Sequence, residues 1–253
     1  MSQIEKAKTF LNLHSKGRPV LLYNAWDAGS AKAVVRAGAS AVATSSWAMA
    51  AAHGHTDGES IPVSLVHEIV SRVVSAVEVP VSVDFEGGYS SSESGLSDNI
   101  ERLLALGVVG INFEDRVVSG EGLHAIDHQA RRIAAIRSAA TKLGVPLFIN
   151  ARTDLFLGRG TPDPKDSMTA ALERAAAYAA AGASGYFVPG LKDEGLIGRL
   201  CERVELPVNV MMMNGVPSPQ RLGELGVARV SWGHMAYVDA MAGLERAAKS
   251  IYG

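Results

Sequence analysis

The stretch Val79-Pro80-Val81-Ser82-Val83-Asp84-Phe85-Glu86-Gly87-Gly88-Tyr89 joins a short apolar run to two acidic residues and a pair of glycines. The apolar run predicts a buried strand. The acids stand where this strand ends, and the glycines leave space for a ligand to approach the backbone. The stretch therefore predicts a strand whose C-terminal end carries a functional site.

The next apolar run, residues 108–113, ends in the same way, in Glu114 and Asp115. Carboxylates that cluster at neighbouring strand ends repel one another and lose water. A hard cation relieves both effects, and Mg²⁺ suits carboxylate and water ligands. An alternative remains open, in which these acids only cap the helices that follow.

The composition excludes several classes of protein. The chain has 253 residues, of which 47% are hydrophobic, and a net charge of −2 without a basic block, so we expect neither nucleic acid nor a membrane as a partner. The only cysteine, Cys201, excludes an internal disulfide and a cysteine-based zinc site, and its position within a helical stretch indicates a packing residue. Neither a signal peptide nor a membrane-spanning run is evident, which predicts a cytoplasmic protein.

Strand-like and helix-like runs alternate along the whole chain without a break in composition, which predicts one domain over residues 1–253. A glycine ends most of the helical stretches, as in Leu106-Gly107-Val108. Eight such units in about 250 residues favour a (β/α)₈ TIM barrel. The rival, an open doubly wound sheet, favours a G-x-G-x-x-G turn that is missing after the first strand. The predicted strands cover residues 20–24, 41–46, 79–84, 110–114, 146–151, 185–188, 208–212 and 229–232.

The active site of such a barrel lies at the C-terminal ends of its strands. After the second strand, the hydroxyl and N–H groups of Ser45, Ser46 and Trp47 could hold a carboxylate, or they could form an ordinary polar turn. After the fifth strand, Arg152 could bind a substrate carboxylate and offset the acids, or form a structural ion pair with one of them. Asn209 is a neutral polar residue in the apolar run of the seventh strand, which makes it a candidate for substrate binding at the mouth.

The ordered set of these motifs resembles the isocitrate lyase/phosphoenolpyruvate mutase superfamily. The matching pieces include Asn24-Ala25-Trp26-Asp27, Asp57-Gly58-Glu59, Asp84-Phe85-Glu86-Gly87-Gly88, Phe113-Glu114-Asp115, Ala151-Arg152-Thr153-Asp154 and Pro207-Val208-Asn209. The resemblance implies a barrel of the phosphoenolpyruvate/pyruvate type that binds Mg²⁺, or Mn²⁺ in its place, and a small 2-oxo or 2-hydroxy carboxylate.

The resemblance also implies roles for individual residues. Asp84 would hold the metal directly, and Asp57, Glu86 and Glu114 would act directly or through metal-bound water. Ser45, Ser46 and Arg152 would hold the substrate carboxylate, and Arg152 would stabilise the charge of a developing enolate together with the metal. Subunits of the family form homo-oligomers, so a dimer or tetramer is expected.

The sequence departs from the family in the loop after the fourth strand. The carbon–carbon lyases carry Lys-x-Cys-Gly-His there, and the phosphonate-forming mutases carry Lys and Asn. Residues 116–124 read Arg-Val-Val-Ser-Gly-Glu-Gly-Leu-His and contain none of Cys, Lys or Asn, which indicates a phosphonomutase-like subgroup without the lyase cysteine. Glu121 or His124 could donate a proton, or could simply make the lid polar. Gly120 and Gly122 fit a lid that opens and closes.

These observations support three functional hypotheses. The first is a Mg²⁺-dependent lyase that cleaves a C–C bond of a small 2-oxo or 2-hydroxy dicarboxylate through a pyruvate-type enolate. Decarboxylation demands least of the lid, because CO₂ leaves without protonation. The second is a C–P bond enzyme, similar to phosphonopyruvate hydrolase or phosphoenolpyruvate mutase. The third is a catalytically silent homologue that binds keto acids.

Overall fold

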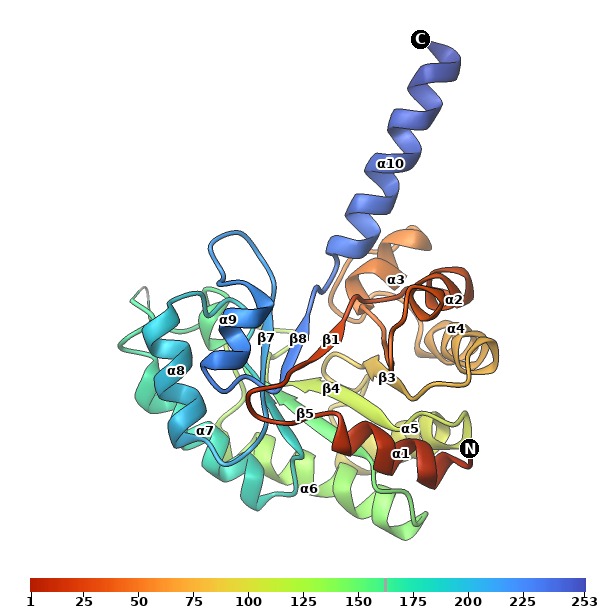
Figure 1. Cartoon of the computed structure of the whole chain (residues 1–253). Helices are drawn as coiled ribbons and strands as arrows, with labels where there is room; N and C mark the ends of the chain where they lie inside the picture. Colours follow the sequence, from red (N-terminus) through yellow and green to blue (C-terminus); the bar gives the residue numbers. More distant parts are fainter. Residues whose placement is uncertain (162) are drawn as a thin grey trace.

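Eight parallel strands form a barrel in the computed structural model, which describes residues 1–161 and 163–253 (Figure 1). The strand order is β1-β8-β7-β6-β5-β4-β3-β2. A bridge between Ala25 and Thr44 connects β1 to β2, where Ala25 N donates to Ala43 O at 2.8 Å and so nearly closes the barrel. The strands are Val20–Leu22, Val42–Ala43, Val81–Asp84, Gly110–Glu114, Phe148–Arg152, Gly185–Phe187, Val208–Met211 and Arg229–Ser231, β1 to β8. The predicted (β/α)₈ architecture is confirmed.

Helices follow the strands and cover most of the outside of the barrel (Figure 1). The glycines predicted to end the helices have left-handed backbone angles, for example Gly107 with φ of 95° and Gly226 with φ of 92°. The helices are α1 Gln3–Asn12, α2 Ala28–Arg36, α3 Ser46–Ala52, α4 Val63–Ala76, α5 Glu93–Ala105, α6 Ile126–Lys142, α7 Met168–Ala180, α8 Glu194–Arg203, α9 Pro219–Glu224 and α10 Met235–Tyr252, with a 3₁₀ turn at Asp154–Phe156.

Helix α1 closes the end of the barrel where the strands begin. Its Phe10 belongs to a small apolar cluster that includes Val20, Val109 and Phe148, which lie at or just before the start of β1, β4 and β5. The His14 ring, just after α1, stacks on Phe148 with a centroid distance of 4.0 Å, and its Nδ1 pairs with Phe10 O at 2.7 Å. This plug leaves the opposite end, where the strands finish, as the mouth of the barrel.

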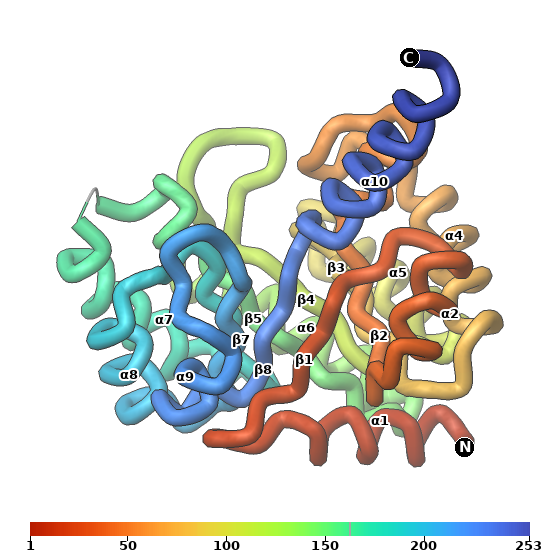
Figure 2. Tube along the Cα trace, turned by 45° about the horizontal axis from the view of Figure 1, so that its top comes forward, coloured from red at the N-terminus to blue at the C-terminus, as the bar shows by residue number. Residues whose placement is uncertain are grey.

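Helix α10 differs from the other helices because it projects away from the barrel (Figures 1 and 2). Ala236 is the only residue of α10 that is buried. Its exposed apolar side chains include Val238, Met241, Leu244, Ile251 and Tyr252. Strand β8 is thus followed by a helix, as in the other βα units, but α10 does not cover the strands beside it.

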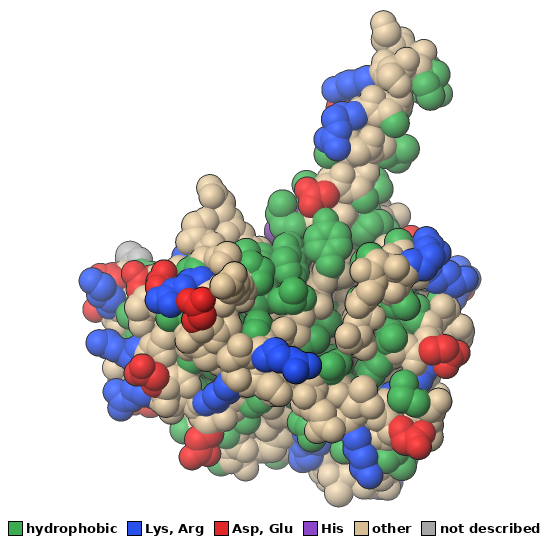
Figure 3. All heavy atoms as spheres, in the orientation of Figure 1, with side chains coloured by type: hydrophobic (Ala, Val, Ile, Leu, Met, Phe, Trp, Pro, Cys, Tyr) green, Lys and Arg blue, Asp and Glu red, His purple; other side chains and the backbone are tan. Residues whose placement is uncertain are grey.

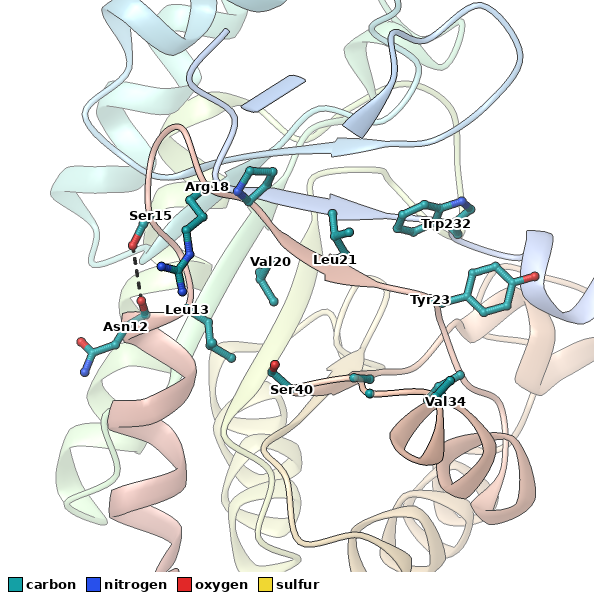
Figure 4. Close-up of a pocket in the computed structure, with 14 residues that line it drawn as sticks. Asn12, Leu13, Ser15, Arg18, Val20, Leu21, Tyr23, Val34, Ser40 and Trp232 are labelled. Atoms are coloured by element: carbon teal, nitrogen blue, oxygen red, sulfur yellow. Dashed lines mark hydrogen bonds between the residues drawn. The ribbon is translucent and has the colours of Figure 1, made fainter. Parts of the chain in front are cut away.

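The uncovered flank beside β1 is apolar and hollow. Figure 3 shows hydrophobic side chains gathered on the face below the base of α10. A groove of about 870 Å³ runs along this flank between β1 and the end of α2, with Leu21, Tyr23, Val34 and Trp232 among its lining residues (Figure 4). Leu21 and Tyr23 are 48% and 40% exposed, although they lie on or directly after a barrel strand. This groove lies on the side of the barrel, away from the acids at its mouth.

None of the helices in the described part of the chain is long and apolar enough to cross a membrane.

Candidate active site

The Asp84 carboxylate lies at the end of β3 and is held from two sides. Its Oδ2 accepts hydrogen bonds from the backbone N–H (3.1 Å) and the hydroxyl (2.8 Å) of Ser46. Its Oδ1 accepts a hydrogen bond from Asn112 Nδ2 (3.3 Å). These donors are neutral, so they orient the carboxylate without balancing its charge. Asp84 is therefore suited to act as an oxygen ligand for a cation.

Glu86 follows on a backbone with φ of 47°, a left-handed conformation that is uncommon outside glycine. Its carboxylate is buried and accepts hydrogen bonds from Glu59 N (2.7 Å) and the Tyr89 hydroxyl (3.0 Å). Burial, with the charges of Asp57 and Asp84, raises the pKa of Glu86 to about 7. Unfavourable backbone angles that bring a buried carboxylate among other acids are typical of functional sites.

Glu114 ends β4 and pairs with Arg152 on β5, the next strand. The distance from Arg152 Nη1 to Glu114 Oε2 is 2.8 Å. Arg152 also donates from Nε (2.6 Å) and Nη2 (3.1 Å) to the carboxylate of Asp154. Burial raises the pKa of Glu114, although the positive charge of Arg152 opposes this shift. The second oxygen of Glu114, Oε1, is buried and has no hydrogen-bond partner in the described part of the chain.

Asp57 approaches the same cluster from the loop between α3 and α4. Burial, followed by the charge of Asp84, raises the pKa of Asp57. Its Oδ2 lies 3.8 Å from Nη1 of Arg116, which begins the lid loop after β4. The structure thus brings together Asp57, Asp84, Glu86, Glu114 and Arg152.

A divalent cation fits this cluster. Burial and the charges of neighbouring carboxylates raise the pKa of Glu86 and Glu114, and the buried Glu114 Oε1 has no partner among the described residues, so this oxygen is free to coordinate a cation. Among the described residues, no three Asp, Glu, His or Cys side chains converge into a ready-made metal cage. Mg²⁺ does not need such a cage, because it usually keeps several waters and binds to only one or two carboxylates. Asp84 is the candidate direct ligand, with Glu86, Glu114 and Asp57 around it.

The residues after β2 have separate roles. The Ser45 side chain accepts a hydrogen bond from Ala48 N (3.3 Å) and caps α3, whereas Ser46 binds Asp84. The Trp47 ring packs against His234 and Tyr237 at the base of α10, with centroid distances of 4.8 and 6.1 Å. Ser46 thus lies closest to the acids, and Trp47 contacts α10.

Two residues lie elsewhere than expected. Asn209 is fully buried inside the barrel, where its side chain binds Asn150 and Ser231, because it pairs in register with the first residue of β8 rather than with the end of that strand. It does not reach the mouth as a substrate-binding residue. Asp115 points away from the acid cluster and binds Arg174 (3.0 Å) and Tyr178 (2.9 Å), because successive side chains at a strand end face opposite sides.

The lid loop, residues 116–124, stands above the mouth as a yellow-green loop in Figure 2. Glu121 is exposed near its tip. Burial, with the charge of Arg132, lowers the pKa of His124 to about 4, so its imidazole is neutral near pH 7. His124 therefore offers no imidazolium proton near pH 7.

Sequence reasoning missed three residues that organise the site. Asp154 shares Arg152 with Glu114, and its place two residues after Arg152 in the strand-end motif was a usable signal. Asn112 binds Asp84 from inside the barrel, and its polar side chain within an apolar run was a second signal. Arg229 binds Asn112 from β8, but its position at the start of a predicted strand gave no indication of this contact.

A family model described as phosphoenolpyruvate phosphomutase matches residues 10–252. The chain belongs to this family. The family forms part of the isocitrate lyase/phosphoenolpyruvate mutase superfamily, whose enzymes are lyases, mutases and hydrolases. The fold, the acid cluster and Arg152 thus occur in a member of an enzyme superfamily.

Individual relatives are consistent with the family assignment. An uncharacterised protein from Mycobacterium tuberculosis is 33% identical to the chain. The matched region covers 96% of this chain and 88% of the Mycobacterium tuberculosis protein. A protein from Burkholderia cenocepacia J2315, whose crystal structure is assigned only provisionally as a phosphonomutase, is 44% identical in sequence. Its structure matches with a TM-score of 0.95 over 98% of this chain and 99% of that one. The structure of a phosphonopyruvate hydrolase in complex with oxalate and Mg²⁺ has a TM-score of 0.86 at 19% identity, covering 100% of this chain and 87% of that one, and shares the fold.

Proposed function

We propose that the protein is a Mg²⁺-dependent lyase that cleaves a C–C bond in a small 2-oxo or 2-hydroxy dicarboxylate, with decarboxylation of an oxaloacetate-like acid as the preferred reaction. The observation that carries this proposal is the juxtaposition of Arg152 with the acid cluster around Asp84 and Glu114. The acid cluster offers oxygen ligands for a cation, and the guanidinium of Arg152 offers N–H donors for a substrate carboxylate.

Arg152 keeps part of its binding capacity for a ligand. A guanidinium has five N–H donors. Arg152 directs Nε and Nη2 to Asp154, and its Nη1 forms an ion pair with Glu114, so its other N–H groups remain for a ligand. The remaining N–H groups lie on Nη1 and Nη2, and a guanidinium can bind a carboxylate bidentately. Asp154 and Glu114 hold the guanidinium in place.

The proposed step begins with cleavage of the bond between the departing carboxylate carbon and its neighbour. The electron pair moves toward the 2-oxo group and gives a pyruvate-type enolate, while CO₂ departs. The enolate then takes a proton from water and becomes pyruvate. When bound, Mg²⁺ would supply Lewis-acid stabilisation of the developing negative charge. Arg152 adds a fixed positive charge to the same region.

The lid favours decarboxylation over aldol-type cleavage. It contains no cysteine or lysine, Glu121 is exposed, and His124 is neutral near pH 7. A reaction whose leaving group needs no proton therefore suits this lid best. The C–P alternative would require the lid to orient a phosphoryl group or a water.

The test is to incubate the protein with Mg²⁺ and a panel of 2-oxo and 2-hydroxy dicarboxylates together with phosphonopyruvate, and to follow pyruvate release. Asp84→Ala is the blank, and Cys201→Ser is the control because Cys201 is buried in α8. Release from a carbon dicarboxylate that the blank abolishes supports the proposal. Release from phosphonopyruvate alone would assign the protein to C–P chemistry. Tight keto-acid binding without any turnover would favour the catalytically silent alternative.

We also propose that the protein forms a homo-oligomer in which α10 packs on a second copy. The support is the exposed apolar side chains of α10 and the uncovered groove beside β1 (Figure 4). Light scattering after size exclusion should give a dimer or a tetramer. Leu244→Asp should shift this assembly toward the monomer, and an unchanged mass would contradict the role of α10.

A further inference from the structure

A buried arginine lies beneath the acid cluster, inside the barrel. Arg229 is the first residue of β8 and is 1% exposed. Its Nη2 donates a hydrogen bond to Asn112 Oδ1 (3.1 Å). Its Nε and Nη1 have no partner among the residues that the structure describes. A charged group with such incomplete pairing is costly to bury, so its presence calls for a role.

Asn112 connects this arginine to the proposed metal ligand. Its Oδ1 accepts hydrogen bonds from Arg229 Nη2 and from Asn150 Nδ2 (2.9 Å). Because both partners are donors, the carbonyl oxygen of Asn112 must face them, and its amide nitrogen must face the other way. That nitrogen donates to Asp84 Oδ1 at 3.3 Å. A continuous hydrogen-bonded path therefore runs from Arg229 through Asn112 to Asp84.

The charges around this path point to the same connection. Asp84 is bound directly by the neutral groups of Ser46 and Asn112. Above it, Arg152 is engaged by Glu114 and Asp154. Burial lowers the pKa of Arg229 to about 9. The negative charge of Asp84 stabilises the guanidinium and offsets part of this shift. Arg229 thus remains a cation near pH 7 on the inner side of Asp84.

We propose that Arg229 is a positioning residue that acts through Asn112 to orient the Asp84 carboxylate and balance its charge for a divalent cation. This inference rests on the proposed Mg²⁺ site. Residues that support a metal ligand from behind typically change metal affinity about 10- to 100-fold when they are removed. Arg229→Met keeps an unbranched apolar side chain in the barrel but removes the charge and the donors.

The matched control is Arg137→Met. Arg137 is half-buried, whereas Arg229 is fully buried, and it donates to Gly182 O, Leu147 O and Ser184 Oγ, which lie where β5 and β6 begin, at the end of the barrel opposite the mouth. Both variants lose hydrogen bonds and should lose stability. Only Arg229→Met should lose metal affinity, so a merely structural role predicts equal behaviour of the two variants.

The measurement is Mg²⁺ binding by calorimetry without any substrate. Arg229→Met is expected to weaken binding at least tenfold, and Arg137→Met less than twofold. Asn112→Leu breaks the same path, so the double variant Arg229→Met/Asn112→Leu should be no weaker than the weaker single variant. Additive losses, or an unchanged affinity in Arg229→Met, would overturn the inference. If the wild-type protein itself fails to bind Mg²⁺, the proposed function fails first and this inference fails with it.

A second measurement on the wild-type protein avoids any problem of folding. The side-chain ¹⁵N signals of Arg229 and Asn112 should shift during a Mg²⁺ titration, in step with the backbone signal of Asp84. The Arg137 signals should stay fixed. Shifts at Asp84 without any change at Arg229 and Asn112 would show that the path does not connect them, and would contradict the proposal.

Discussion

Replacing Arg152 by lysine tests how the site holds a substrate carboxylate. The guanidinium reaches Asp154 with Nε and Nη2 and Glu114 with Nη1, and keeps N–H donors on Nη1 and Nη2 for a ligand. Lysine places three donors on a single nitrogen, and the carboxylates of Asp154 and Glu114 take two of them. At most one donor then remains for the ligand, so Arg152→Lys removes at least one charge-assisted hydrogen bond.

The size of the effect follows from that loss. A hydrogen bond to a charged group contributes about 1.5–3 kcal/mol. Since 1.4 kcal/mol corresponds to about a factor of ten, oxalate should bind about 10- to 150-fold more weakly to Arg152→Lys than to the wild-type protein. The positive charge is kept, so the loss reports on geometry rather than on net charge.

Calorimetric titration with oxalate at saturating Mg²⁺ measures this loss. Arg137→Lys is the control, because Arg137 donates only to groups near the beginning of β5 and β6. Thermal unfolding of each variant checks that the fold is intact. A loss of less than tenfold in a folded Arg152→Lys protein would remove Arg152 from substrate binding and leave it as a structural ion pair.

Two further predictions concern groups away from the mouth. Burial lowers the pKa of His14 from its ordinary value of 6.5 to about 3, so between these pH values the unfolded chain binds a proton at His14 and the folded protein does not. The contribution of neutral His14 to stability is therefore complete above pH 6.5 and decreases as the pH falls. Between pH 7 and 5 the free energy of unfolding decreases by about 2 kcal/mol. The difference in free energy of unfolding between the wild type and His14→Phe should shrink by that amount in urea titrations, and a constant difference would contradict the neutral plug. Burial raises the pKa of the Cys201 thiol to about 11, so the thiol stays protonated near pH 7. Cys201→Ser should leave turnover nearly unchanged, and the buried serine hydroxyl should lower the free energy of unfolding by about 1–3 kcal/mol. Abolished turnover in a folded variant would assign the thiol a role in the reaction.

The barrel could be predicted from the sequence because its signals are local. Each strand is a short apolar run, and glycines such as Gly107 end the preceding helices with backbone angles that other residues resist. The strand signal recurs eight times and the glycine signal follows most of the helices, so an error in one unit would not change the fold class. The direction of α10 could not be predicted, because its apolar side chains indicate only that they need a partner, not which surface supplies it.

The acids of the site were also predictable, because parallel strands that end in acids bring them to the same edge. Contacts between side chains were less so. Asn209 was expected at the mouth but is bonded inside the barrel, since strand register, rather than composition, decides the depth of a residue. The neutral state of His124 depends on its burial and on Arg132, eight positions later in the chain, and a residue pattern does not report either.

The central claim is that the acids at the mouth form a divalent cation site organised around Asp84. Calorimetric titration of the wild-type protein and of Asp84→Ala with Mg²⁺, at equal concentrations and with unfolding curves for both, tests it most directly. The account predicts one Mg²⁺ ion per chain in the wild type and loss of tight binding in a folded Asp84→Ala protein. Equal affinity in the two proteins would contradict the claim and would place any bound cation elsewhere.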